Sequence, residues 1–142
     1  MIVPDVNLLL YAYDSTSPFH SRAVTWWSSC LSGDEAVGLL APVVFGFVRI
    51  STSPRAFAAP LGIDDAAAHV RSWLAQPPAE FLEMTDDDVL VALELLERAG
   101  TGGNLTTDAQ VAAVARRHRA VVHTADPDFA RFTGVRWIHP LR

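Results

Sequence analysis

Lysine is missing from this chain of 142 residues, whose eleven basic residues are all arginine. Every mechanism that needs a lysine is therefore excluded. Cys30 is the only cysteine, which excludes both an intrachain disulfide and a cysteine-based metal cluster. Whatever chemistry the chain performs must come from other side chains, and carboxylates are the main candidates.

Two further absences concern location. No apolar run approaches the roughly 20 residues that a membrane-spanning helix needs. The N-terminus also lacks a basic segment followed by an apolar core, as a signal peptide would have. We therefore expect a soluble, cytoplasmic protein that does not enter a membrane. The net charge of −5 indicates no general affinity for nucleic acid, although a local basic face is compatible with it.

The pattern of apolar residues predicts one domain over residues 1–142. Half of the residues are hydrophobic, which is typical of a folded chain of this length. Strands are predicted at 2–4, 36–40, 80–84, 120–123 and, at the sheet edge, 135–138. Helices are predicted at 7–14, 19–31, 43–50, 64–75, 85–99 and 108–118. This alternation predicts an α/β fold, with a parallel central sheet of four to five strands flanked by helices on both faces.

Local signals indicate where some of these helices begin. Asn7 is a good N-cap for the first helix. Thr107 with Gln110 fits the capping-box pattern, so the last helix is predicted to start near residue 108. The acidic run 86–88 resembles a metal site, but acids at a helix start are stabilised by the helix dipole. We interpret this run as structural.

Three distant aspartates are predicted to meet at one edge of the sheet. Asp5 follows the first strand and Asp126 follows the fourth, so both lie at the carboxyl edge, where α/β proteins commonly bind ligands. Asp108 lies in the first turn of the helix that leads into the fourth strand, and such a helix starts at the same edge. Asp108 also shares a helix face with Val111 and Ala115, which should turn it toward the sheet.

Carboxylates grouped in this way repel each other unless a cation or protons compensate their charge. Oxygen ligands suit Mg²⁺ or Mn²⁺, and such an ion can polarise a phosphoryl oxygen and activate water. The predicted chemistry is metal-assisted phosphodiester hydrolysis. Each aspartate also has a structural interpretation, as a helix-start residue for Asp5 and Asp108 or as a cap before Pro127 for Asp126. A phosphatase with Asp5 as nucleophile is disfavoured, because such sites usually need a lysine.

Several segments resemble a known family in the expected order along the whole chain. They are 5–12 (DVNLLLYA), 103–109 (GNLTTDA) and 126–132 (DPDFARF), with 47–50 (FVRI) and 137–141 (WIHPL) fitting one branch. These segments resemble the PIN-domain ribonucleases and are most similar to VapC-type toxins of bacterial toxin–antitoxin pairs. The resemblance implies a Mg²⁺-dependent endoribonuclease, with Mn²⁺ as an alternative, held inactive by a cognate VapB-type antitoxin and commonly homodimeric.

The resemblance also implies roles for individual residues. Asp5, Asp108 and Asp126 match the metal-binding and catalytic aspartates, Asp128 is a supporting acid, and Asn7 matches a residue that helps to order the first aspartate. One departure concerns position 46. Many relatives have a glutamate in the helix after the second strand, and this chain has glycine there. An inactive PIN-fold module that still binds an antitoxin is therefore the alternative function.

Basic residues near the predicted edge are candidate contacts. Arg49, Arg55 and Arg131 could hold RNA phosphates or acidic groups of an antitoxin. Trp26 and Trp27 are adjacent and so cannot both face one side of a helix. One of them, with a neighbouring phenylalanine of the helix 43–50, either forms a groove for a partner or belongs to the core.

Overall fold

Five short strands form one sheet in the computed structural model, which describes residues 1–142. They are β1 (Ile2–Pro4), β2 (Val37–Leu40), β3 (Ala79–Leu82), β4 (Val121–His123) and β5 (Arg136–Ile138). Their order across the sheet is β3-β2-β1-β4-β5, and every neighbouring pair is parallel. The predicted parallel sheet is confirmed, with five strands. β1 occupies its centre, directly beside β4.

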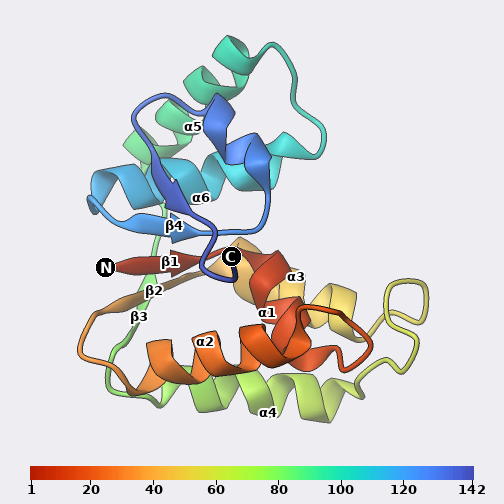
Figure 1. Ribbon diagram of the computed structural model, residues 1–142. Helices are drawn as coiled ribbons and strands as arrows, with labels where there is room; N and C mark the ends of the chain where they lie inside the picture. Colours follow the sequence, from red (N-terminus) through yellow and green to blue (C-terminus); the bar gives the residue numbers. More distant parts are fainter.

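Six α-helices and one short 3-10 helix surround this sheet. They are α1 (Val6–Tyr13), α2 (His20–Ser32), α3 (Ala41–Ser51), α4 (Ile63–Leu74), α5 (Asp86–Ala99), α6 (Leu105–Arg117) and η1 (Pro127–Arg131). In Figure 1, α2 and α4 lie below the strands, and α5 and α6 lie above them. None of the helices has the length and apolar character that crossing a bilayer requires.

Two predicted helix starts were wrong. The N-cap of α1 is Asp5, whose side chain accepts a hydrogen bond from the Val6 backbone N–H, so Asn7 lies inside the helix. Helix α6 begins at Leu105, and the predicted cap at Thr107 is already helical. Gly103, at φ +55°, adopts the left-handed conformation just before Asn104, the N-cap of α6. Asp108 remains in the first turn of α6, as predicted.

The acidic run 86–88 forms the first turn of α5, in agreement with its structural interpretation. The Thr85 side chain accepts from the Asp88 backbone N–H, and the Asp88 side chain accepts from the Thr85 backbone N–H, which completes a capping box. Asp88 is buried and also pairs with Arg117 of α6, with a 2.9 Å distance between Oδ2 and Nη2. This pair ties the start of α5 to the end of α6, the helix that carries Asp108.

One apolar core joins the helices to the sheet. Thirty-one buried residues form a single cluster, to which strands and helices from the whole chain contribute. Trp27 and Phe47 are buried in it and pack edge-on against Trp73. Phe45, two residues away on α3, is 67% exposed. Of the aromatic residues considered as a groove, the Trp27 and Phe47 side chains therefore belong to the core.

Candidate functional site

Asp5 lies where β1 ends and α1 begins, at the carboxyl edge of the sheet. Only 2% of the residue is exposed. Its Oδ1 accepts from the Val6 backbone N–H at 2.7 Å, and its Oδ2 accepts from the Thr124 hydroxyl at 2.7 Å. Burial raises the pKa of Asp5, while the hydrogen bonds from Thr124 and Val6 oppose that shift. The carboxylate is thus held in one orientation at the centre of the sheet.

Thr124 connects the two ends of the chain, a role that the sequence analysis did not predict. It follows β4 directly and is fully buried. Its hydroxyl donates to Asp5 and accepts from the Asp126 backbone N–H at 2.9 Å. The only sequence signal was its position, because Thr124 is a polar residue at a strand end just before a candidate aspartate. Threonine at such a place is usually interpreted as part of a turn.

Asn7 reinforces the same connection. Its side-chain N–H donates to Asp5 Oδ2 at 3.1 Å, and its carbonyl accepts from the Ala125 backbone N–H at 3.3 Å. Because Ala125 follows β4, Asn7 joins the first turn of α1 to the segment that carries Asp126. The side chain therefore lies against the first aspartate, as the resemblance implied.

Asp126 lies between β4 and η1, with Asp128 two residues further on. Asp126 is the N-cap of η1, since its Oδ1 accepts from the Asp128 backbone N–H at 2.8 Å. Asp126 is therefore a helix cap, as its structural interpretation predicted. The other carboxylate oxygen, Oδ2, accepts no hydrogen bond from the protein. Asp128 is exposed to solvent.

Asp108 lies in the first turn of α6, and its ionised form is disfavoured. Burial, followed by the negative charges of Asp5, Asp126 and Asp128, raises the pKa of Asp108 to about 7. The negative charges of Asp5, Asp126 and Asp128 therefore all act on Asp108 and disfavour its ionised form. Asp108 has no hydrogen-bonding partner within the protein that would stabilise its charged form, in contrast to Asp5.

The carboxylates influence the pKa of Asp108, but they do not form a metal-binding cluster in this structure. No group of three or more Asp, Glu, His or Cys side chains lies close enough together to hold a metal ion. The donor set nevertheless fits a hard divalent cation, because it consists of carboxylate oxygens only. The raised pKa of Asp108 indicates a place where a positive charge would be stabilised.

Position 46 of α3 lies close to this site. A Cβ added to Gly46 would be 3.5 Å from Cγ2 of Val6, the residue after Asp5, which is an ordinary van der Waals contact. The glycine is therefore not required by close packing. A larger side chain at this position would extend beside the first turn of α1.

The three candidate arginines are all exposed. Arg131 donates to the Ala99 carbonyl at 3.0 Å and so holds the end of α5. Arg49 and Arg55 form no ion pair in the structure, which leaves their guanidinium groups available to a ligand. Arg49 lies on α3, in the same stretch as the exposed Phe45.

Sequence comparison identifies the family of this fold and site. The sequence model of the PIN domain matches residues 2–135. The chain belongs to the PIN-domain family. It is 47% identical over 142 residues to Ribonuclease VapC33 of Mycobacterium tuberculosis, covering 100% of this chain and 99% of that one. It is 39% identical over 140 residues to Ribonuclease VapC37 of the same organism, covering 99% and 97%.

Solved structures of other PIN-domain toxins have the same fold. Mycobacterium tuberculosis VapC20, described as a sarcin-ricin loop cleaving toxin, aligns with a TM-score of 0.72 at 22% identity, covering 96% of this chain and 99% of that one. VapBC2 from Rickettsia felis, bound to a DNA fragment from its promoter, aligns with a TM-score of 0.66 at 16% identity, covering 97% and 98%. These likenesses establish the fold, and the recognition of a VapC-type PIN domain from sequence is confirmed.

Proposed function

We propose that this protein is a divalent-metal-dependent endoribonuclease and the toxin of a type II toxin–antitoxin pair. The observation that carries this proposal is that Asp5 and Asp126 directly precede α1 and η1, and that their negative charges help to raise the pKa of Asp108. Full-length similarity to chains named as ribonucleases supports the same activity.

The three aspartates would hold Mg²⁺, with Mn²⁺ as an alternative and Asp128 as a supporting acid. When bound, the ion supplies Lewis-acid polarisation of a phosphoryl oxygen and makes a water molecule more acidic. Thr124 and Asn7 keep Asp5 oriented, and the first turn of α6 directs Asp108 toward it. Water adds to phosphorus and one phosphorus–ribose oxygen bond breaks, so the two product strands end in a phosphate and a hydroxyl.

RNA cleavage by purified protein, freed of any partner, tests this proposal. With Mg²⁺ we expect wild-type protein to cut RNA at defined positions, and chelation of the metal should abolish the cuts. Asp5→Asn should lose the activity. Asp87→Asn is the matched control, since it removes the same charge from an exposed position at the start of α5. Equal cleavage by wild type and Asp5→Asn would refute the proposal.

A VapB-type antitoxin is the proposed protein partner. The structural neighbours include VapB–VapC complexes, and this chain exposes Phe45 on the same helix as Arg49. An apolar anchor beside a free guanidinium suits a helix that carries both apolar and acidic side chains. Arg49, Arg55 and Arg131 remain proposed contacts for RNA phosphates or for acidic groups of that partner.

A homodimer is the proposed assembly, and α5 is the surface we assign to it. Val89, Leu90 and Leu93, here called the α5 patch, are 46%, 64% and 51% exposed. The patch borders a hollow of about 290 Å³ that Met84 also lines, and Met84 continues the apolar surface to Phe81 on the edge strand β3. A monomer rarely exposes so continuous an apolar surface without a partner.

The alternative function is a PIN-fold module that binds an antitoxin but cuts nothing. Gly46 is the observation in its favour, because no acid on α3 completes the site. Calorimetry distinguishes the two functions. Absence of any heat on titration with Mg²⁺ or Mn²⁺, together with a stable antitoxin complex, would favour the inactive module.

A further inference from the structure

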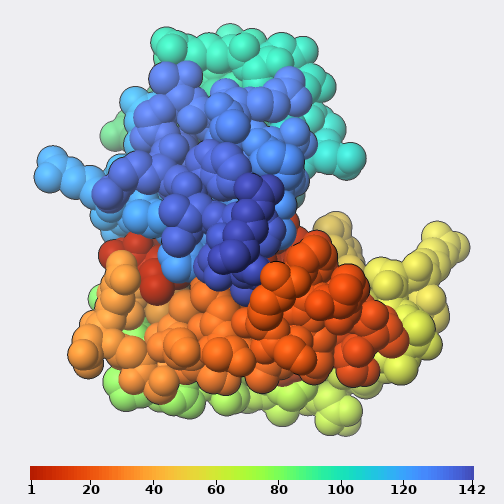
Figure 2. Space-filling view, in the orientation of Figure 1, coloured from red at the N-terminus to blue at the C-terminus, as the bar shows by residue number.

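A second hollow lies between α2 and the end of the chain, away from the carboxylates. Its volume is about 530 Å³, within the range of about 300–1,000 Å³ that is common for pockets holding small organic groups. Its walls include Arg22, Thr25 and Trp26 from α2, with Leu141 and Arg142 from the C-terminal segment. Figure 2 shows that segment, in dark blue, lying directly against the orange surface of α2. We call this hollow the Trp26 pocket.

Two arginine side chains, of Arg22 and Arg142, line the Trp26 pocket. Neither Arg22 nor Arg142 forms an ion pair in the structure. Burial, followed by the charges of Arg142 and Arg22, lowers the pKa of the neighbouring His139. Arg22 is also held in place, since its Nη1 donates to the Leu141 carbonyl at 2.8 Å and its guanidinium lies 5.3 Å from the centre of the Phe19 ring. Its remaining N–H groups are free to bind an anion.

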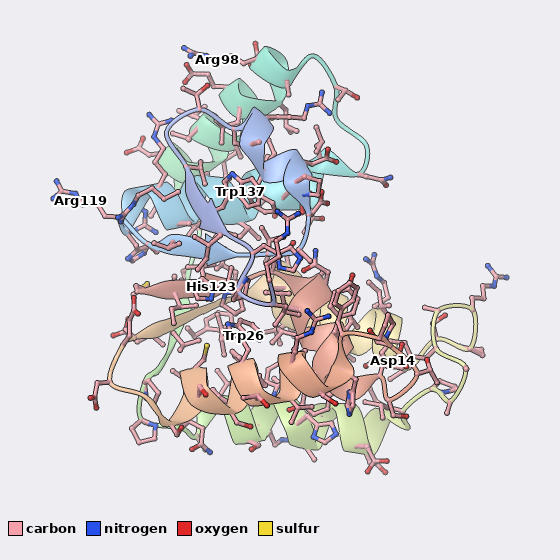
Figure 3. All side chains as sticks on the ribbon, viewed as in Figure 1. Asp14, Trp26, Arg98, Arg119, His123 and Trp137 are labelled. Atoms are coloured by element: carbon pink, nitrogen blue, oxygen red, sulfur yellow. The ribbon has the colours of Figure 1, made fainter.

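Trp26 provides a fixed aromatic wall for the same pocket. Its indole N–H donates to Nδ1 of His123 at 3.0 Å, and its ring packs 5.4 Å from that of Trp27. Figure 3 shows Trp26 and His123 beside one another between α2 and the sheet. Burial lowers the pKa of His123, which keeps its imidazole neutral and able to accept this bond. The indole is only partly buried and borders the open hollow.

β4 connects the Trp26 pocket to the candidate active site. His123 is the last residue of β4, and its backbone carbonyl accepts from the Asp5 backbone N–H at 2.9 Å. Thr124, the next residue, holds the Asp5 carboxylate. The end of β4 therefore positions both the Trp26 side chain and Asp5. A single-stranded RNA could extend from the pocket to the candidate active site.

We propose that the Trp26 pocket binds an unpaired nucleotide of the RNA substrate next to the segment being cut, with the base stacked on Trp26 and a phosphate held by Arg22 and Arg142. This inference rests on the proposed ribonuclease function and deepens it. An aromatic face beside free cations is the combination by which proteins bind single-stranded nucleic acid. A helical protein partner would instead require a longer apolar groove than this short pocket offers, because two arginines, a serine and a threonine share the lining with its apolar residues.

RNA binding by an uncleaving protein tests this inference. The probe is a short, fluorescein-labelled single-stranded RNA, and its anisotropy is measured over a range of salt concentrations on the Asp5→Asn protein. Arg22→Ala and Arg142→Ala should each weaken binding and lower the slope of log Kd against log salt by about 0.7. Trp26→Leu should weaken binding by about five- to 100-fold without changing the slope. Trp26→Phe, which keeps an aromatic face but loses the bond to His123, should retain most of the affinity.

Arg71→Ala is the matched control, because Arg71 is an exposed, unpaired arginine on α4. Arg22, Arg142 and Trp26 variants that bind RNA like Arg71→Ala would overturn the inference. So would variants that lose affinity for the antitoxin while keeping affinity for RNA, because the pocket would then serve the protein partner. If wild-type protein cuts no RNA but these variants still weaken RNA binding, the ribonuclease proposal fails and the pocket assignment stands.

Discussion

A single buried carboxylate shows how this protein keeps a reactive group inside its fold. Asp5 lies at the sheet centre, where burial raises the pKa of the acid. Hydrogen bonds to Thr124, Val6 and Asn7 occupy both of its oxygens. Net stabilisation by a hydrogen bond to a charged group is about 1.5–3 kcal/mol, so these donors offset much of the cost of burial. The orientation of Asp5 therefore depends on its neighbours.

Replacement of Thr124 tests that dependence. Thr124→Val keeps the shape but removes the donor to Asp5 and the acceptor for the Asp126 backbone N–H. We expect the free energy of unfolding to fall by about 1–3 kcal/mol and metal binding to weaken. Thr124→Ser keeps the hydroxyl and should resemble wild type in urea unfolding and in calorimetric titration with Mn²⁺. Identical behaviour of the valine and serine variants would show that the hydroxyl does not position Asp5.

Asp108 gives a prediction about pH. Its pKa rises from an ordinary 3.8 to about 7 in the folded protein. In metal-free buffer the unfolded chain releases this proton first, so Asp108 destabilises the fold increasingly as pH rises from about 4 to 7, and fully above that. Asp108→Asn should therefore be more stable than wild type at pH 8, by on the order of 1–2 kcal/mol, and equally stable near pH 4.

Thermal unfolding across this pH range, with and without Mg²⁺, provides the measurement. Added Mg²⁺ should stabilise wild type and leave Asp108→Asn little changed, because the ion compensates the charge that the variant lacks. An asparagine variant that is less stable than wild type at pH 8 without metal would contradict the repulsion assigned to Asp108.

At the scale of elements, two helices determine where Asp108 lies. Helix α6 delivers the aspartate, and α5 packs along α6. The Asp88–Arg117 pair joins the start of one helix to the end of the other, and Arg117 also donates to the Glu83 carbonyl at 2.9 Å. Asp88, the buried member of this pair, therefore takes part in both the cap of α5 and the link to α6.

Asp88→Ala should therefore lower the free energy of unfolding by about 2 kcal/mol at pH 7, through loss of both the cap and the pair. Burial opposes ionisation of Asp88, but hydrogen bonds from Arg117 and Thr85 outweigh it and lower its pKa. The stabilisation is thus complete above the unfolded pKa and is lost as pH falls through the folded value. The gap between variant and wild type should narrow in acid. Asp87→Ala, at the exposed neighbour, should cost at most about 0.5 kcal/mol in the same denaturation experiment.

Helix α3 offers a gain-of-function prediction at Gly46. Because a side chain fits there beside Val6, Gly46→Glu should place a further carboxylate near Asp5. We expect tighter Mn²⁺ binding, by about three- to tenfold, than in Gly46→Gln. The glutamine variant is the control, since both substitutions remove a helical glycine and should stabilise α3 by about 0.5–1 kcal/mol. Equal metal affinity in the two variants would place position 46 outside the coordination sphere.

For the whole molecule, the α5 patch and the candidate site lie on different elements. Asp5 and Asp126 cap α1 and η1, and Asp108 lies on α6, whereas the α5 patch lies on a helix that carries none of these aspartates. The proposed dimer can therefore be tested by substitutions that leave the candidate site residues unchanged.

Leu90→Glu and Leu93→Glu should convert the proposed dimer to monomer. Both side chains are more than half exposed, so the charge should be tolerated by the folded monomer. Light scattering after size-exclusion chromatography gives the mass, and circular dichroism checks the fold. Phe45→Glu is the control, an equally drastic change at an exposed position on another helix. A wild-type protein that is monomeric at all concentrations would remove α5 from consideration as an interface.

Sequence reasoning located the large features of this molecule and missed the small ones. The apolar segments predicted all five strands and six helices. Strands of a parallel sheet are buried on both faces and therefore appear in the sequence as short, nearly continuous apolar runs. The proposed meeting of Asp5, Asp108 and Asp126 at one edge was predicted from the direction of the strands and of the helix that carries Asp108, and it remains a prediction. Thr124 was missed, since a buried hydroxyl that bridges distant segments has no local signature. The early start of α6 was also missed, because the capping pattern at Thr107 competed with a glycine bend before it.

The bond between Thr124 and Asp5 joins residues 119 positions apart, and it forms only when β4 settles beside β1. A polypeptide emerging from the ribosome would therefore lack this arrangement until Thr124 had left the exit tunnel. Under the proposed nuclease function, Asp5 would remain without its Thr124 donor until that point of synthesis. A fragment that ends before residue 121 would lack β4, Thr124 and Asp126, and we expect it to cut no RNA.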